Sequence, residues 1–269
     1  MRPRFFIFGL GYVASHLAWM LEAKGWEVIS TGSAGTLTFD DHANVRLALA
    51  DASHVLSSVP PGGDGDPVLD TYGDALGGKW LGYFSSTGVY GDRGGAWVDE
   101  SASTGTGRRT ARAHADARWL ARGARVLRLP GIYGPGRSVF DRLEAGKAHR
   151  IDLPGQVFSR VHVEDVVSAT QSALNASQGA YNVADNEPAS QNAVIEHACR
   201  LLGRDPPPLT GLDEAGLTPA ARAFYAENRR IANGKARRLL GWRPRYSSYR
   251  EGLAALVASA QGNREPGDR

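Results

Sequence analysis

Cysteine is almost absent from this sequence, and its scarcity sets a first limit on the chemistry. Cys199 is the single cysteine among 269 residues, so the chain forms no internal disulfide bond. It lies in the helical pattern of residues 194–202, where a small core residue is a better interpretation than a nucleophile. A chain without disulfides is typical of a reducing compartment, and we expect a cytoplasmic protein.

Long hydrophobic runs and metal-ligand spacings are also absent. No apolar run approaches the roughly 20 residues that cross a bilayer, so we expect no membrane contact. The first apolar segment is short and leads into a glycine motif, which argues against a secretion signal. The seven histidines are dispersed along the chain, so we expect no metal site.

The chain also lacks a strong excess of charge of one sign. It has 31 basic and 28 acidic residues, a formal net charge of +3, and its arginines are scattered. This pattern does not predict nucleic-acid binding. We expect instead a small-molecule substrate, bound by a monomer or a homodimer.

Glycine, in contrast, is abundant, and two glycines near the N-terminus form a recognisable motif. Apolar residues 4–8 predict a strand, and a Gly-x-Gly-x-x-Ala pattern follows it and opens an amphipathic helix. The first glycine permits the tight turn, the second lets a pyrophosphate approach the backbone, and the alanine lets the helix pack closely. Free N–H groups of the first helical turn would then face the phosphates. A purely structural glycine turn is the alternative. The dinucleotide interpretation predicts contacts from Gly9, Gly11, Tyr12, Val13 and Ala14.

Strand and helix patterns alternate through the first half of the chain. The predicted strands cover residues 27–31, 36–39, 54–59, 80–85 and 125–129, and the predicted helices cover residues 42–50, 67–76 and 110–122. Such alternation indicates an α/β fold with a doubly wound parallel sheet (a Rossmann fold), in which ligands bind beyond the carboxyl ends of the strands. We expect a dinucleotide-binding core over residues 1–135. Residues 136–260 would complete the core and form a small C-terminal substrate-binding cap, and residues 261–269 would form a flexible tail.

Two further segments make the pattern specific. Residues 85–91 (Ser-Ser-Thr-Gly-Val-Tyr-Gly) follow one predicted strand, and residues 127–137 (Leu-Arg-Leu-Pro-Gly-Ile-Tyr-Gly-Pro-Gly-Arg) follow the next. Together with the glycine motif, they resemble the extended short-chain dehydrogenase/reductase superfamily, of the NAD-dependent epimerase/dehydratase type. Residues 160–166 and 181–185 also resemble that superfamily, as does the late segment 240–244, so the resemblance covers nearly the whole chain.

The sequence departs from the superfamily at its catalytic pair. The resemblance implies a Tyr followed four residues later by Lys, whose cation lowers the pKa of the phenol so that it can exchange a proton. The four lysines are each preceded, four residues earlier, by Met, Ala, Leu or Ile, so no such pair exists. If Asp116 matches the acid that follows the motif, Arg108 and Arg112 replace the pair. Arginine can bind an anion or the cofactor ribose but cannot act as an acid or base. Exposure on a solvated basic helix is the alternative for both.

The remaining candidates can be assigned through the resemblance. Ser86 and Thr87 could hydrogen-bond a substrate oxygen, or cap the end of their strand. The phenols of Tyr90 and Tyr133 could replace the missing acid, or pack structurally. Bidentate recognition of a phosphate or carboxylate suits arginine. We therefore predict substrate binding by Arg108, Arg137 and Arg160, and exposure to solvent is the alternative for Arg137 and Arg160.

The cofactor choice depends on the loop after the second strand. An acid there would select NAD, and a nearby arginine would suit the 2′-phosphate of NADP. Residues 30–35 contain neither, and hydroxyls such as that of Ser33 meet a phosphate without repulsion, which favours NADP over NAD. The remaining predicted cofactor contacts are Val59, Pro60, Arg112 and Pro130.

Two functions follow from these observations. The first is an NAD(P)-dependent oxidoreductase, epimerase or dehydratase acting on a small polar substrate, with nucleotide sugars as one candidate class. The second is a non-catalytic NAD(P)-binding sensor or regulatory protein. An intact Ser86 with a substrate-sized cleft bounded by Tyr90, Tyr133 and Arg160 would favour the enzyme. A filled or closed cleft over the nicotinamide position would favour the sensor.

Overall fold

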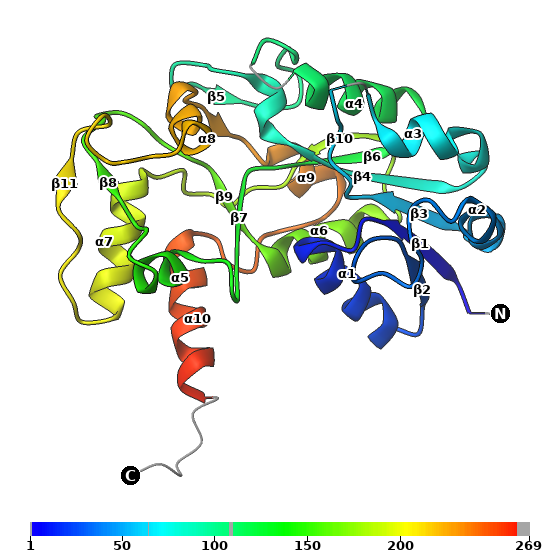
Figure 1. Cartoon of the computed structure of the whole chain (residues 1–269), viewed down its shortest axis with the longest axis horizontal. Coiled ribbons are helices and arrows are strands. Elements are labelled where there is room, and N and C mark those ends of the chain that lie inside the picture. Colours follow the sequence, from blue (N-terminus) through cyan, green and yellow to red (C-terminus); the bar gives the residue numbers. More distant parts are fainter. Residues whose placement is uncertain (1, 64, 108–109, 263–269) are drawn as a thin grey trace.

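A six-stranded parallel sheet forms the centre of the protein in the computed structural model, which describes residues 2–63, 65–107 and 110–262. Its strands occur in the order β10-β6-β4-β3-β1-β2, so the strand order reverses between β1 and β3 (Figure 1). Such a reversal opens a crevice at the carboxyl edge of the sheet. The strands are β1 (Arg4–Phe8), β2 (Glu27–Ser30), β3 (His54–Ser57), β4 (Trp80–Ser86), β6 (Arg125–Leu129) and β10 (Gly179–Asn182).

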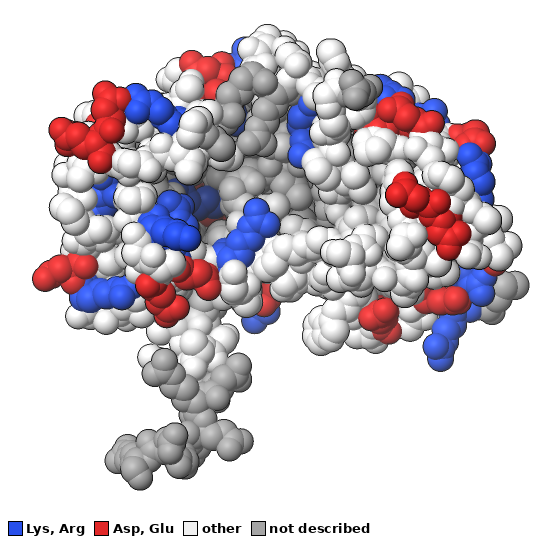
Figure 2. Space-filling model, in the orientation of Figure 1, with Lys and Arg blue, Asp and Glu red and all other residues white. Residues whose placement is uncertain are grey.

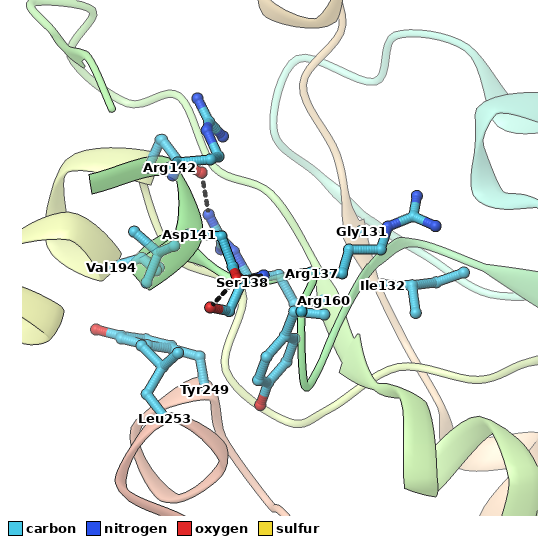
Figure 3. A pocket seen from close by; sticks show the side chains of 14 residues that line it. Gly131, Ile132, Arg137, Ser138, Asp141, Arg142, Arg160, Val194, Tyr249 and Leu253 are labelled. Atoms are coloured by element: carbon cyan, nitrogen blue, oxygen red, sulfur yellow. Dashed lines mark hydrogen bonds between the residues drawn. The ribbon is translucent and has the colours of Figure 1, made fainter. Parts of the chain in front are cut away.

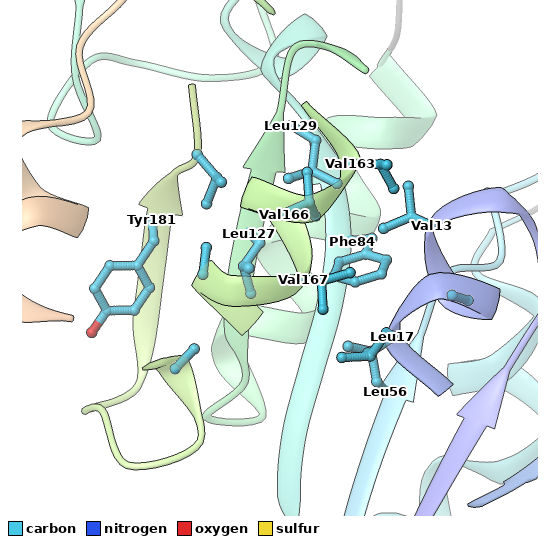
Figure 4. Packing of buried hydrophobic residues seen from close by; sticks show 14 of the residues in the cluster. Val13, Leu17, Leu56, Phe84, Leu127, Leu129, Val163, Val166, Val167 and Tyr181 are labelled. Carbon is cyan, nitrogen blue, oxygen red and sulfur yellow. The ribbon is translucent and has the colours of Figure 1, made fainter. Parts of the chain in front are cut away.

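Helices cover both faces of this sheet, which confirms the predicted doubly wound α/β class. On one face, α1 (Tyr12–Ala23) and α6 (Val163–Ala173) pack together over Phe84 and Leu127 (Figure 4). Apolar residues three and four apart line the buried side of both helices. The other face is covered by α2 (His42–Asp51), α3 (Pro67–Tyr72) and α4 (Thr110–Ala121), and the 3₁₀ turn η1 (Gly73–Leu76) extends α3.

The strand predicted over residues 36–39 is wrong. Only one isolated parallel bridge forms there, between Thr31 and Leu37, so β2 is the edge strand. The ring of Phe39 instead packs 5.3 Å from that of Tyr72, and the Tyr72 hydroxyl donates to the Phe39 carbonyl. These contacts hold Phe39 against α3, whereas Leu37 keeps one hydrogen bond to the Ser30 carbonyl at the end of β2, at 3.0 Å.

Most of the remaining elements gather beside the carboxyl edge of the sheet, where the cap is expected (Figure 1). Three two-stranded parallel ladders occur there: β5 (Trp97–Val98) with β12 (Arg230–Ile231), β7 (Gly131–Tyr133) with β9 (Arg160–His162), and β8 (Arg150–Ile151) with β11 (Leu209–Thr210). Five further helices and two 3₁₀ turns complete the fold: α5 (Val139–Glu144), α7 (Gln191–Leu201), α8 (Pro219–Arg222), α9 (Gly234–Leu239), α10 (Tyr249–Gly262), η2 (Thr87–Tyr90) and η3 (Ala223–Ala226).

The C-terminal part of the chain contributes to both regions. Helix α6 and strand β10 belong to the central core, whereas α5, α7 and α10 share a separate apolar cluster. The boundary proposed at residue 135 stays a prediction. Helix α10 includes residues 261 and 262, so these two positions are helical, and the rest of the predicted tail lies outside the described residues. None of the described helices has the length and hydropathy needed to cross a membrane.

Candidate functional site: a dinucleotide groove and an arginine-rich cleft

Three loops meet beyond the carboxyl ends of β1 and β3, where the strand order of the sheet reverses. The Leu10 amide donates to the Thr31 carbonyl at 2.8 Å, and the Ser58 hydroxyl donates to the Gly9 carbonyl. A Cβ at Gly9, where φ is +81°, would lie 3.0 Å from Cγ2 of Val59. The loops after β1, β2 and β3 therefore form one connected surface at the crevice, as expected for a dinucleotide groove.

Gly11 has the geometry that a pyrophosphate site requires. A Cβ built at this position meets no protein atom within 4 Å, so its absence leaves space for a ligand. Gly11 is also the N-cap of α1 and has no side chain to cap the helix. The positive end of α1 can therefore receive phosphate oxygens.

The other predicted groove residues lie around this position. Val13 and Ala14 are buried under the turn, so their side chains support the helix and only their backbone can face a ligand (Figure 4). The Tyr12 hydroxyl donates to the Pro135 carbonyl at 3.0 Å, which ties α1 to the turn after β7. Ser33 and Pro60 are exposed on the loops after β2 and β3.

A cleft of about 590 Å³ lies beyond the carboxyl ends of β4 and β6. Figure 2 shows a hollow in the middle of this face, with basic side chains beside it. Its inner wall holds Ser86, Thr87 and Pro130, so the structure brings three predicted residues together. The Ser86 hydroxyl also accepts from the Gly88 amide at 3.1 Å, so it caps η2 while lining the cleft.

The two candidate phenols are not part of this wall. Tyr90 is fully buried, donates to Asn182 Oδ1 at 2.8 Å and accepts from Arg128 Nη1 at 2.9 Å. The Tyr133 hydroxyl is buried against Gly252 and has no hydrogen-bond partner among the described residues. Burial raises the pKa of both phenols above the ordinary value. The geometry gives neither hydroxyl a direct route to a substrate in the cleft.

Arg112 points inward from α4 rather than into solvent. Its Nη1 lies 3.4 Å from the Tyr83 hydroxyl and 3.5 Å from the Phe84 carbonyl, near the carboxyl half of β4. This position suits a contact with a cofactor bound along the sheet edge. Arg108 lies outside the described residues.

Sequence reasoning missed the role of Arg128. Its guanidinium forms a buried bidentate pair with Asp116, with Nη2–Oδ1 at 2.7 Å and Nε–Oδ2 at 3.0 Å. The Ser85 hydroxyl donates to the same carboxylate at 2.6 Å. The pair locks α4 against β4 and β6, and so fixes the ends of both strands under the cleft. An arginine within an apolar strand pattern, twelve residues from an acid on the preceding helix, was the available signal.

Four guanidiniums line the cleft, and one of them, Arg229, is paired with Glu227 at 2.9 Å. Arg137 and Arg160 were predicted, and Arg142 was missed because it lies on the exposed side of α5. Arg160 is buried and donates to the carbonyls of Phe158 and Ala189 and to Gln191 Oε1, at 2.8–3.0 Å. Burial lowers the pKa of Arg160 to about 10, so the group stays charged at neutral pH.

A second hollow of about 420 Å³ continues from the cleft, and we call it the side chamber. Gly131, Ile132, Arg137, Arg142, Arg160 and Gln191 line both spaces. Figure 3 shows Val194, Tyr249 and Leu253 on the side of α7 and α10, opposite Ile132. The described residues contain no cluster of three or more His, Cys, Asp and Glu side chains suited to a metal ion.

Comparison with known proteins finds relatives by sequence and by fold. No family model matches the chain. It is 30% identical to protein YeeZ of Escherichia coli strain K12 over 242 residues, which are 75% of this chain and 84% of YeeZ. It is also 35% identical over 140 residues to the 3-diazoavenalumate denitrifying reductase of a Streptomyces species, and that match covers 48% of this chain and 45% of the reductase.

Solved structures show the same fold. A functionally unknown conserved protein from Silicibacter pomeroyi is 38% identical, with a TM-score of 0.84 over 96% of this chain and 99% of that one. Human epimerase family protein SDR39U1, solved with NADPH, is 15% identical, with a TM-score of 0.76 over 94% of this chain and 99% of its own. The chain therefore shares its fold with these structures, as the predicted resemblance to epimerase/dehydratase-type proteins implies. By its sequence, the chain belongs to the family of protein YeeZ.

Proposed function

We propose that the protein is an NAD(P)-dependent oxidoreductase that reduces a small organic anion. The observation that carries this proposal is an open cleft that holds Ser86, Thr87 and four guanidiniums, one of which, Arg137, lies over the ring of Tyr12 at the start of α1. Ser86 and Arg160 line this cleft as expected, whereas Tyr90 and Tyr133 do not. We take the open cleft as support for an enzyme over the sensor alternative. Two similar proteins support an NAD(P)-dependent oxidoreductase: the Streptomyces relative is named a reductase, and SDR39U1 was solved with NADPH.

The residues present fit a nicotinamide dinucleotide. Gly11 and the N-terminus of α1 would hold the pyrophosphate, and the loop around Ser33 would receive the adenosine ribose. No carboxylate occupies residues 31–35, so we retain the preference for NADP. A bound nicotinamide would supply or accept hydride at the ends of β4 and β6.

Reduction is the direction that the available groups support. The hydroxyls of Ser86 and Thr87 can donate hydrogen bonds to a carbonyl oxygen and stabilise the negative charge that develops on it. None of the groups on this wall is a base tuned to neutral pH, and the pKa of each nearby phenol is raised. Proton removal from an alcohol would therefore be harder than proton supply to an alkoxide. The substrate binds to a monomer or a homodimer in this proposal.

Turnover tests the proposal directly. Purified protein with NADPH or NADH should reduce members of a panel of carbonyl compounds that carry a carboxylate or phosphate, followed by loss of reduced-nicotinamide absorbance. Ser86→Ala should lower kcat by about tenfold, because one hydrogen bond to the developing oxyanion is lost. Ser53→Ala, at the opposite edge of the sheet, should leave kcat unchanged. If the cofactor binds and no compound turns over, the sensor alternative replaces the enzyme.

Arg112 provides a separate test of cofactor binding. Arg112→Ala should raise the Kd for NADPH by three- to tenfold, about 1 kcal/mol, and should weaken the dependence of binding on salt. Arg118→Ala is the matched control, because Arg118 lies on the same helix and pairs with Asp70 at an exposed site. Equal affinity of both variants in calorimetry would assign Arg112 to a solvated or structural role.

A further inference from the structure

The side chamber has an apolar wall that the fold builds in advance. Val139 of α5, Val194 of α7, and Tyr249 and Leu253 of α10 belong to one buried cluster and face this space. Their backbones lie in three different helices, so the wall depends on packing rather than on a single mobile loop. Apolar side chains from several elements around a space of about 420 Å³ are typical of a binding pocket for an apolar group.

The border between the chamber and the cleft is cationic. The printed hydrogen bonds of Arg160 go to two carbonyls and an amide oxygen, and those of Arg142 go to the Lys147 carbonyl. Arg137 lies over the Tyr12 ring, 5.4 Å from its centre. Among the described residues, none of these three guanidiniums forms an ion pair with a carboxylate.

Asp141 and Asp185 lie near this border, and neither neutralises it through a direct pair. A further acid of the cleft, Glu227, is paired with Arg229. Asp141 accepts from the amide and hydroxyl of Ser138 at 2.6 Å, in the capping box of α5. Asp185 is buried and attracts Arg160 only through space, and burial raises its pKa to about 7. A ligand anion at the border would therefore meet cations whose charge is incompletely compensated.

The polar groups of the chamber are poorly arranged for a sugar or a nucleobase. Ser138 and Asp141 already satisfy each other, and the buried hydroxyls of Tyr133 and Tyr249 have no partner among the described residues. Sugar hydroxyls placed against the apolar wall of Val139, Val194 and Leu253 would lose hydrogen bonds to water without replacement, which costs about 1–3 kcal/mol each. An aromatic ring or hydrocarbon chain carries no such cost.

We propose that the side chamber binds the apolar part of an amphipathic organic carboxylate, whose anionic group is held by Arg137 and Arg142 at the border. This inference rests on the proposed function, because it takes the adjoining cleft as the place of reaction. It narrows the substrate class to aryl or alkyl carboxylates and disfavours nucleotide sugars.

Calorimetry with three redox-inert probes tests the inference. The probes are 3-phenylpropanoate, its neutral analogue 3-phenylpropan-1-ol, and UMP, each titrated into the full chain with and without saturating NADP⁺. We expect 3-phenylpropanoate to bind at least tenfold more tightly than either other probe. Tighter binding of UMP, or binding of none of the three to protein that binds NADP⁺, would overturn the inference.

Two variants locate the bound probe. Val194→Phe should fill the chamber, and Arg142→Gln should remove an exposed cation; each should weaken 3-phenylpropanoate binding about tenfold without changing the Kd for NADP⁺. Arg200→Gln, on the last turn of α7, is the control. If both variants bind the probe like the wild type, the carboxylate site lies elsewhere, although the proposed function survives. If NADP⁺ fails to bind, the proposed function fails, and Arg142-dependent probe binding still supports the chamber.

Discussion

Gly11→Val is expected to weaken dinucleotide binding by at least a hundredfold, which corresponds to about 2.7 kcal/mol. The valine side chain would project into the space next to the α1 N-terminus, where no protein atom lies within 4 Å of the added Cβ. The fold should survive for the same reason, because the substitution displaces ligand rather than protein. Calorimetry with NADPH measures the affinity, and circular dichroism verifies the fold.

Gly77→Val is the matched control for this experiment. A Cβ at Gly77 also meets no atom within 4 Å, but Gly77 precedes β4 and lies at the amino edge of the sheet. Its variant should bind NADPH like the wild type. Comparable binding by Gly11→Val would place the pyrophosphate outside the glycine turn and remove the basis for the cofactor assignment.

Arg128→Leu is expected to destabilise the protein by about 3–5 kcal/mol, because it leaves the Asp116 carboxylate buried without its cation. Asp116 and Arg128 have side-chain exposures of only 1% and 4%, so water cannot replace the lost partner. The Tyr90 hydroxyl would also lose its donor. Urea denaturation measures the free energy of unfolding.

Two comparisons separate this effect from general sensitivity to mutation. Arg118→Leu removes an arginine from the exposed pair with Asp70 and should cost less than about 1 kcal/mol. The double variant Arg128→Leu with Asp116→Leu should be less destabilised than the sum of its single variants, because neither charge is left unpaired. Additive losses would show that the pair contributes no coupling energy.

The structure shows which contacts helix α4 makes in place of a Tyr–Lys pair. Arg112 extends toward β4, and the pair of Asp116 and Arg128 fixes the same helix against the sheet. Helix α4 can thus position a cofactor and the strand ends, but none of its described residues lines the cleft. Ser86 and Thr87 remain the groups closest to the expected reaction centre by their position on the cleft wall.

The sequence by itself determined the fold class and predicted the place of the dinucleotide groove. Strand and helix periodicities are local, so residues 4–23 predict β1, the glycine turn and α1 without knowledge of any distant contact. The carboxyl-end rule then places Ser86, Thr87 and Pro130 at one edge of a parallel sheet, where the structure has them. The same local reasoning failed at residues 36–39, because contacts of Phe39 with Tyr72 outweigh a weak strand preference.

Only the tertiary structure decided which polar groups face ligand and which hold the core. Tyr90 and Arg128 are separated by 38 residues, yet their hydrogen bond buries both, so sequence position could not reveal that the phenol is unavailable. The side chamber likewise depends on Val194 and Leu253, which helices α7 and α10 bring to one space. Side-chain burial and charge compensation arise from contacts between distant segments, and local periodicity carries no information about those contacts.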